Sequence, residues 1–144
     1  MPTLDRTRAL AAGLAKAIGL DQVPPDDSGG YHLTVGEATD IFVYGGDDET
    51  ILLVAPVATL PRSVDYGLAL YLLRANMFDS DMAPFQFAAD AQGGLIFWGR
   101  LRIVDFDGTS LSALIDRVAE RVREFRAEVE GPAQAGAPGN QPQR

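Results

Sequence analysis

The chain has 144 residues, of which 47% are hydrophobic, so it can form one domain with a hydrophobic core. It contains no cysteine, which excludes disulfides, thiolate metal sites and cysteine nucleophiles. The formal net charge of −8 comes without the cluster of Lys and Arg that nucleic acids and anionic membranes require. No apolar run approaches the roughly 20 residues that span a bilayer. We therefore expect a cytoplasmic protein with neither a nucleic-acid nor a membrane partner.

The N-terminal half predicts one helix followed by three strands. Residues 4–18 carry an apolar stripe at helical spacing. Residues 21–30 are rich in Pro, Asp and Gly and predict a loop. Short stretches of alternating apolar residues, joined by tight turns, then predict an antiparallel meander of three strands over residues 31–35, 39–44 and 49–58.

The C-terminal half predicts a helix, a hairpin and a last helix. The first of these helices spans residues 63–76, with Ser63 as a suitable N-cap after Pro61. The hairpin strands cover residues 85–89 and 95–104, and the last helix runs from about residue 110 to 129.

This order, α-β-β-β-α-β-β-α, predicts an α+β sandwich with an antiparallel twisted sheet. We expect a single domain over residues 1–130. The remaining segment, residues 131–144, is rich in Pro, Gly and Gln, a composition that predicts a disordered tail.

The stretch from Ile51 to Phe78 carries more apolar surface than one small core can bury. Its strand is apolar on both faces, and its helix has two apolar faces, one with Leu68, Leu72 and Ala75 and the other with Leu70, Leu73 and Met77. A helix that is apolar nearly all round must be covered on both sides. The other strands also lack the polar outer face of a sheet covered on one side. We expect a second subunit or a client to supply this cover; the alternative is a compact monomer with helices on both faces.

Two aspartates give the sharpest enzyme signal. The segment IVDFDGTSL, which contains Asp105 and Asp107, resembles the first motif of haloacid-dehalogenase-type phosphatases, in which two such carboxylates serve as nucleophile and acid/base and hold magnesium. Only one helix and a tail follow it, which is too little chain for the rest of such a site. We therefore favour a cap of the last helix by Asp107, Thr109 or Ser110.

Other residues that carry chemistry are few. His32 is the only histidine, so we expect no transition-metal site, and we predict no enzyme activity, cofactor or small-molecule substrate. Arg100 and Arg102 share a strand face with Trp98, where a solvated edge is favoured over a contact with an acidic partner.

Three consecutive segments carry a family resemblance. The strand ILLVAPVATLP leads through a proline turn into a helix that ends LYLLRANMF, similar to a Leu-Leu-x-x-Asn ending, and the hairpin FQFAADAQGGLIFWGRL precedes a long helix. Together with the element order, these patterns resemble the CesT/SycE-like (class I, Tir chaperone) type III secretion chaperones of Gram-negative bacteria. The resemblance covers about residues 4–129. The loop at residues 23–30 and the C-terminal tail depart from the family pattern.

The resemblance implies a homodimeric, non-enzymatic chaperone that binds the N-terminal segment of a secreted effector and keeps it soluble and secretion-competent. It implies a dimer interface on the second helix and the following strand, with the residues Leu68, Leu72, Leu73, Phe85 and Phe87. It implies a client groove on the first helix and the sheet, with the residues Leu14, Ile18, Leu33, Val35, Ile41 and Val43. Core packing is an equally good explanation for each of these residues.

Two alternatives to the chaperone remain open at this point. One is a regulatory or interaction domain of the same fold, of the YbjN-like kind. The other is a small magnesium-dependent phosphatase that uses the DFDGT motif. A bound partner that is not secreted would favour the first, and magnesium-dependent turnover of a phosphate ester would favour the second.

Overall fold

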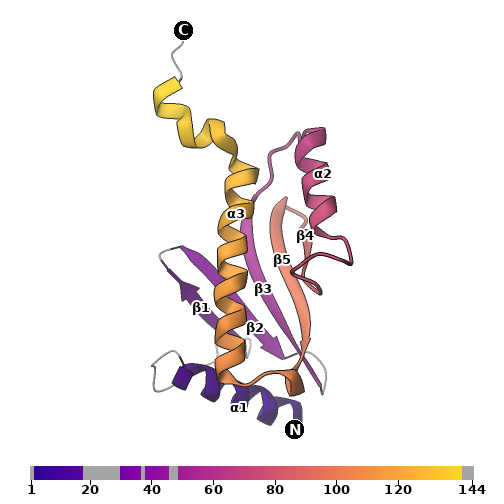
Figure 1. Ribbon diagram of the computed structural model, residues 1–144, viewed down its shortest axis with the longest axis vertical. Coiled ribbons are helices and arrows are strands. Elements are labelled where there is room, and N and C mark those ends of the chain that lie inside the picture. Colours follow the sequence, from indigo (N-terminus) through magenta and orange to yellow (C-terminus); the bar gives the residue numbers. More distant parts are fainter. Residues whose placement is uncertain (1, 18–29, 37, 46–48, 141–144) are drawn as a thin grey trace.

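Three helices and five strands follow one another in the predicted order α-β-β-β-α-β-β-α. The computed structural model describes residues 2–17, 30–36, 38–45 and 49–140 (Figure 1). The elements are α1 (Pro2–Ala17), β1 (Tyr31–Val35), β2 (Thr39–Gly45), β3 (Thr50–Thr59), α2 (Tyr66–Ala75), β4 (Gln86–Ala89), β5 (Gly94–Arg102), a short 3-10 helix (Ile103–Asp105) and α3 (Gly108–Asn140).

The five strands form one antiparallel sheet in the order β1-β2-β3-β5-β4. After α2 the chain returns through β4 and then inserts β5 beside β3, so β4 becomes the outer edge. β3 therefore lies at the centre of the sheet, which suits its apolar sequence. A bulge between Pro56 and Ala58 accommodates the proline that would otherwise interrupt the ladder. The predicted α+β class and antiparallel sheet are confirmed.

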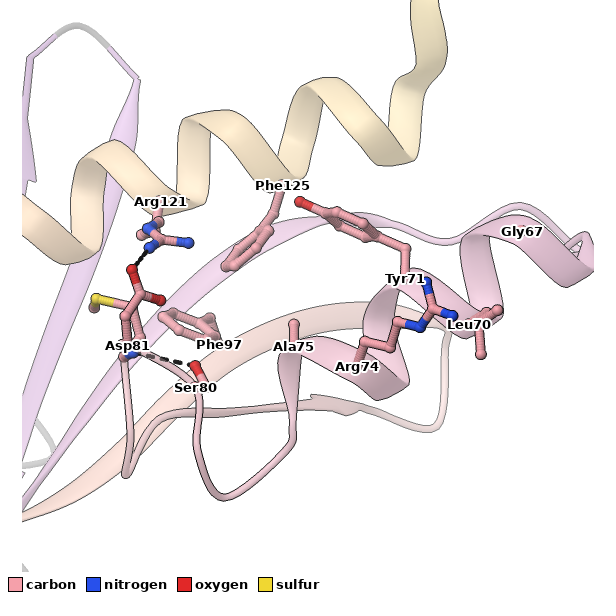
Figure 2. Close-up of a pocket in the computed structure, with 11 residues that line it drawn as sticks. Gly67, Leu70, Tyr71, Arg74, Ala75, Ser80, Asp81, Phe97, Arg121 and Phe125 are labelled. Carbon is pink, nitrogen blue, oxygen red and sulfur yellow. Dashed lines mark hydrogen bonds and ion pairs between the residues drawn. The ribbon is translucent and has the colours of Figure 1, made fainter.

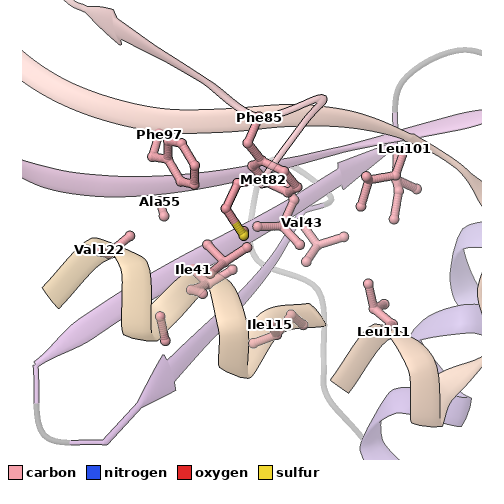
Figure 3. Close-up of a cluster of buried hydrophobic side chains, with 14 of the residues drawn as sticks. Ile41, Val43, Ala55, Met82, Phe85, Phe97, Leu101, Leu111, Ile115 and Val122 are labelled. Carbon is pink, nitrogen blue, oxygen red and sulfur yellow. The ribbon is translucent and has the colours of Figure 1, made fainter. Parts of the chain in front are cut away.

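Helix α3 crosses one face of the sheet, α1 packs against α3, and α2 lies beside the edge strand β4 (Figure 1). Alternate residues of β2, β3 and β5 point toward α1 and α3 and are buried, because side chains of a strand alternate between its two faces. Figure 3 shows part of this core, in which sheet residues meet a stripe from α3. The buried sheet residues are Ile41, Val43, Ile51, Leu53, Ala55, Val57, Leu95, Phe97 and Leu101, and the α3 stripe is Leu111, Ile115, Val118, Val122 and Phe125.

The start of α3 is held by a reciprocal cap. Asp107 Oδ1 accepts a hydrogen bond from the Ser110 N–H at 2.8 Å, and Ser110 Oγ accepts one from the Asp107 N–H at 2.9 Å. Hydrogen bonds that the Asp107 carboxylate accepts, from the Ser110 N–H first and from the Ser110 side chain second, lower the pKa of Asp107. The capping role predicted for Asp107 and Ser110 is confirmed.

Helix α2 begins later than the sequence predicted. Its N-cap is Asp65, whose Oδ1 accepts a hydrogen bond from the Leu68 N–H at 2.7 Å, so the prediction of Ser63 was wrong. Both residue types cap helices well, but a carboxylate gains additional stabilisation from the positive end of the helix dipole.

The last helix passes through a kink. Gly131 has φ 78° and ψ 160°, and the chain then continues helically to Asn140. The disorder predicted from residue 131 onward stays a prediction. Residues 141–144 lie outside the described residues, and the domain boundary near residue 130 stays a prediction.

Helices α1 and α3 meet where each has a glycine. A Cβ built on Gly108 would lie 2.0 Å from both the carbonyl carbon and oxygen of Gly13, which are backbone atoms that a rotamer change cannot move. This contact lets the N-terminal end of α3 approach α1 closely (Figure 1).

We predict that Gly108→Ala lowers the free energy of unfolding by about 3 kcal/mol or more, because the methyl group must displace backbone. Gly45→Ala is the matched control, since its nearest neighbour would be Thr7 Oγ1 at 3.7 Å, an ordinary contact. Urea denaturation followed by circular dichroism measures both. Equal stability of the two variants would show that α1 and α3 are not packed glycine to glycine.

Candidate partner-binding surfaces

The sheet face opposite the helices is open among the residues that the structure describes. Residues of β2, β3 and β5 that point to this side are half-buried or exposed, whereas their neighbours in sequence are buried. Neighbouring strands bring them together, since Phe42 pairs with Val54 and Val54 with Trp98. We call this surface the open face; its apolar residues are Phe42, Tyr44, Leu52, Val54, Ile96 and Trp98.

An aromatic row crosses one end of the open face. The ring of His32 stacks on Phe42 with a centroid distance of 4.5 Å, and Phe42 stacks on Tyr44 at 6.2 Å. His32 Nε2 lies 2.9 Å from Asp40 Oδ1, and the Thr34 hydroxyl donates to the same oxygen at 3.2 Å. These hydrogen bonds, that of His32 above all, lower the pKa of Asp40. The row therefore offers flat rings with a polar end on β1.

Helix α2 carries the second exposed apolar surface. Leu72 and Ala75 pack against the core, while Leu73 is 66% exposed and Met77 is 49% exposed, so the helix has the two apolar faces that the sequence predicted. No residue of α2 is fully buried. Among the described residues, the large hydrophobic side chains that remain exposed belong to α2 or to the segments next to it, apart from Val104: Val64, Tyr66, Leu73, Met77 and Phe78.

A pocket of about 490 Å³ separates α2 from α3 (Figure 2). Tyr71 extends from α2 toward Phe125 of α3, with which it makes an edge contact at 6.0 Å between centroids. Burial, together with the negative charges of Glu128 and Glu124, raises the pKa of Tyr71. Across the pocket Arg121 pairs with Asp81. Helix α2 is thus attached to α3 through few side chains and leaves a cleft behind it.

The residues predicted for the dimer interface divide into two groups. Leu73 is exposed, and Leu68 and Leu72 are half-buried. Phe85 and Phe87 lie instead in the core of the single chain, where Phe85 stacks on Phe97 and Phe87 packs against it with tilted rings. Of the three helix residues only Leu73 is thus largely exposed in the single chain, and the two phenylalanines lie beneath α3.

The residues predicted for the client groove divide in the same way. Leu33 and Val35 of β1 are half-buried and pack at the margin of the core. Ile18 lies outside the described residues. The other three are buried in the core of the single chain: Leu14, Ile41 and Val43. The open face is reached instead by Phe42 and Tyr44, which alternate with Ile41 and Val43 along β2. Strand alternation predicts that the two pairs point to opposite faces, but it does not predict which face is buried.

The aspartates that suggested a phosphatase do not converge. Asp105 ends the short 3-10 helix and is exposed, while Asp107 is engaged in the cap of α3. Among the described residues no three His, Asp or Glu side chains gather as a metal site would require. No helix in the described ranges is both long and apolar enough to cross a membrane.

The comparison with protein families decides the relationship. The model of the Tir chaperone protein (CesT) family matches residues 9–126, which include all five strands and most of the three helices. The chain belongs to the CesT family. This is a family of chaperones, as the resemblance implied. Among curated protein sequences, none matches the chain.

Solved structures of type III secretion proteins share the fold. A chain of the heterodimeric ExoU–SpcU complex from the type III secretion system of Pseudomonas aeruginosa is 26% identical, with a TM-score of 0.69 over 84% of this chain and 98% of that one. A chain of the complex of the Yersinia pestis secretion chaperone SycH with a YscM2 fragment is 18% identical, with a TM-score of 0.68 over 82% and 98%. A chain of the HopA1–SchA chaperone–effector complex is 13% identical, with a TM-score of 0.70 over 85% and 94%.

We predict a small pH-dependent contribution of Asp40 to stability. Its pKa in the folded chain is below the unfolded value of about 3.9, so its contribution is present above that value and is lost as the pH falls through the folded pKa. Because the side chain is half exposed, solvent screening keeps the effect below about 1 kcal/mol.

Urea midpoints of the natural chain and of Asp40→Asn, measured at pH 7 and pH 3, test this. The difference between the two proteins should shrink at pH 3. A difference that is the same at both pH values would mean that Asp40 and His32 are not paired in solution.

Proposed function

We propose that the protein is a type III secretion chaperone that binds a segment of a secreted effector on its open face and edge strand β1. The observation that carries the proposal is the combination of family membership with a five-stranded sheet that has helices on one side only. In the similar structures, the type III secretion chaperone SycH is seen with a fragment of YscM2, and HopA1 and SchA form a chaperone–effector complex.

The open face supplies what an unfolded segment needs. Aromatic and aliphatic side chains on adjacent strands accept apolar anchors, and the burial of these anchors contributes roughly 25 cal/mol per Å². Leu33 and Val35 lie on the edge strand β1, where an extended client can add main-chain hydrogen bonds. The client stays extended, because the open face binds its apolar side chains one by one and does not allow them to pack against each other in a core. The proposal assigns the protein to the cytoplasm and gives it no catalytic step.

Binding on the open face predicts that Phe42→Ser and Trp98→Ser each reduce the amount of effector that co-purifies by at least about tenfold, the effect of losing one buried aromatic anchor. Val104→Ser is the control, since Val104 is apolar and 75% exposed but lies in the 3-10 helix beyond β5, away from the open face. Tandem affinity purification from the native host, with quantitative mass spectrometry, measures the loss.

The captured partner must itself be a type III substrate for the proposal to hold. Deletion of the chaperone gene should abolish secretion of that partner, and complementation with the gene should restore it. A partner that is never secreted would instead favour the regulatory domain of the same fold. If the effector still co-purifies with both variants, the client binds somewhere other than the open face.

We also propose that two copies associate through α2. Tyr66 and Leu73 on the helix, together with Val64 just before it and Met77 and Phe78 just after it, are exposed large apolar residues, and a surface helix normally buries such a face. A two-fold dimer would bring the same face of each copy together.

We therefore predict that Leu73→Glu raises the dimer dissociation constant at least about tenfold, while the monomer loses less than about 0.5 kcal/mol of stability, because Leu73 is largely exposed in the single chain. Leu72→Glu is the contrasting variant, since Leu72 packs on the core and its replacement should unfold the chain. Sedimentation velocity and urea denaturation separate the two effects. A Leu73→Glu variant that remains a tight dimer would place the interface elsewhere.

A further inference from the structure

The two edges of the sheet differ in what they expose. β1 and β4 are the outermost strands, and an edge strand normally presents unpaired N–H and C=O groups that a second strand can bind. On β4 the middle of this edge is already occupied by a side chain from the end of α2.

Asn76 is that side chain. Its Oδ1 accepts a hydrogen bond from the Phe87 N–H at 2.6 Å, and its Nδ2 donates to the Phe87 carbonyl at 3.3 Å. The primary amide thus pairs with both backbone groups of one strand residue, as a neighbouring strand would. Because backbone groups alternate in direction along an antiparallel strand, Phe87 turns both of its groups away from β5. The N–H of Phe85, just before the strand, already donates to the Met82 carbonyl at 2.8 Å.

Asn76 also caps the C-terminal end of α2. Its own N–H donates to the Leu73 carbonyl at 3.1 Å, and the next N–H, of Met77, donates to the Arg74 carbonyl at 3.1 Å. One residue therefore joins the last turn of α2 to the edge of the sheet. This matters because α2 has no fully buried residue and stands over a cleft, so few other contacts fix its direction.

We propose that Asn76 is a specificity-determining residue that closes the β4 edge to strand addition and orients the exposed face of α2. The inference deepens the proposed function and rests on it where it concerns the dimer. A partner on this side meets Leu73 of α2 and Phe78 just beyond the helix, and forms no continuous sheet with β4. Strand addition is left to the opposite edge, β1.

Edge closure can be measured without the dimer. In the monomeric background of Leu73→Glu, hydrogen exchange followed by NMR should show the Phe87 amide protected although it lies on an edge strand. Asn76→Ala should raise its exchange rate at least about tenfold, since both hydrogen bonds to Phe87 are lost. Asn76→Asp keeps an acceptor for the N–H but has no donor for the carbonyl, so its rate should lie between the two.

Gln86→Ala is the matched control, because Gln86 is the exposed neighbour of Phe87 on the same strand and should leave the Phe87 rate unchanged. A Phe87 amide that exchanges rapidly in the unsubstituted chain, or equally slowly in Asn76→Ala, would overturn the proposal whatever the oligomeric state. If Asn76→Ala fails to fold, the exchange rate of the Phe87 amide in Asn76→Asp tests the proposal instead: a rate equal to that of the unsubstituted chain would overturn it.

Orientation of α2 is measured in the dimer. Asn76→Ala should raise the dimer dissociation constant about tenfold in an otherwise natural chain, and Gln86→Ala should not change it. Isotope-filtered NMR should find intersubunit contacts from α2 side chains and none between the Hα atoms of two β4 strands. Paired β4 strands in the natural dimer would overturn edge closure. A natural chain that is monomeric at all concentrations would refute the proposed dimer, while the Phe87 exchange rates would still test the closed edge.

Discussion

The packing of three phenylalanines around Phe97 supports the rest of this fold. Phe97 is 1% exposed and lies within about 5 Å, centroid to centroid, of Phe85, Phe87 and Phe125, which come from the segment before β4, from β4 itself and from α3. Such aromatic pairs contribute about 0.5–1.5 kcal/mol each beyond the area that they bury. Because β4 has only four residues, this cluster adds to the short ladder with β5 that attaches the edge strand to the body of the sheet.

The cluster also explains a glycine in a central strand. A Cβ on Gly99 would lie 3.0 Å from the ring of Phe85, so the strand gives up a side chain to let that ring reach Phe97. From the other side Phe87 makes an edge contact with Phe125 at 4.4 Å. Helix α2 takes part only at the margin, through Tyr71. The tightly packed part of the molecule is therefore β4, β5 and α3, and the helix that carries the exposed apolar surface is added to it loosely.

Much of the architecture could be predicted from the sequence because it depends on local periodicity. The two apolar faces of α2 and the alternation of β3 follow from the spacing of residues that are close in sequence. In the structure Leu72 accordingly points inward and Leu73 outward. The division between core and partner surface could not be predicted in the same way. Phe85 and Phe87 are apolar whether they face α3 or a second subunit, and only the return of β5 beside β3 decides it.

Other features were missed because their partners are distant in sequence. Asn76 ends a helix, which is ordinary for asparagine, and nothing local indicates that its amide pairs with Phe87 eleven residues later. The close approach of Gly13 to Gly108 joins the first helix to the last, and a glycine in a helix reveals no such neighbour on its own. The predicted N-cap of α2 was two residues too early, because Ser63 and Asp65 are both residue types that cap helices.

The position of Trp98 has a practical consequence. It is the only tryptophan in the chain, and it lies half-buried in the middle of the open face, between Val54 of β3 and Gln86 of β4. An indole in that position emits in a partly aqueous environment, and any chain laid across the sheet would change the polarity around it. The molecule thus carries a built-in optical probe at its proposed binding surface. Occupancy can be followed by intrinsic fluorescence in the unlabelled protein, without a dye and without an engineered residue.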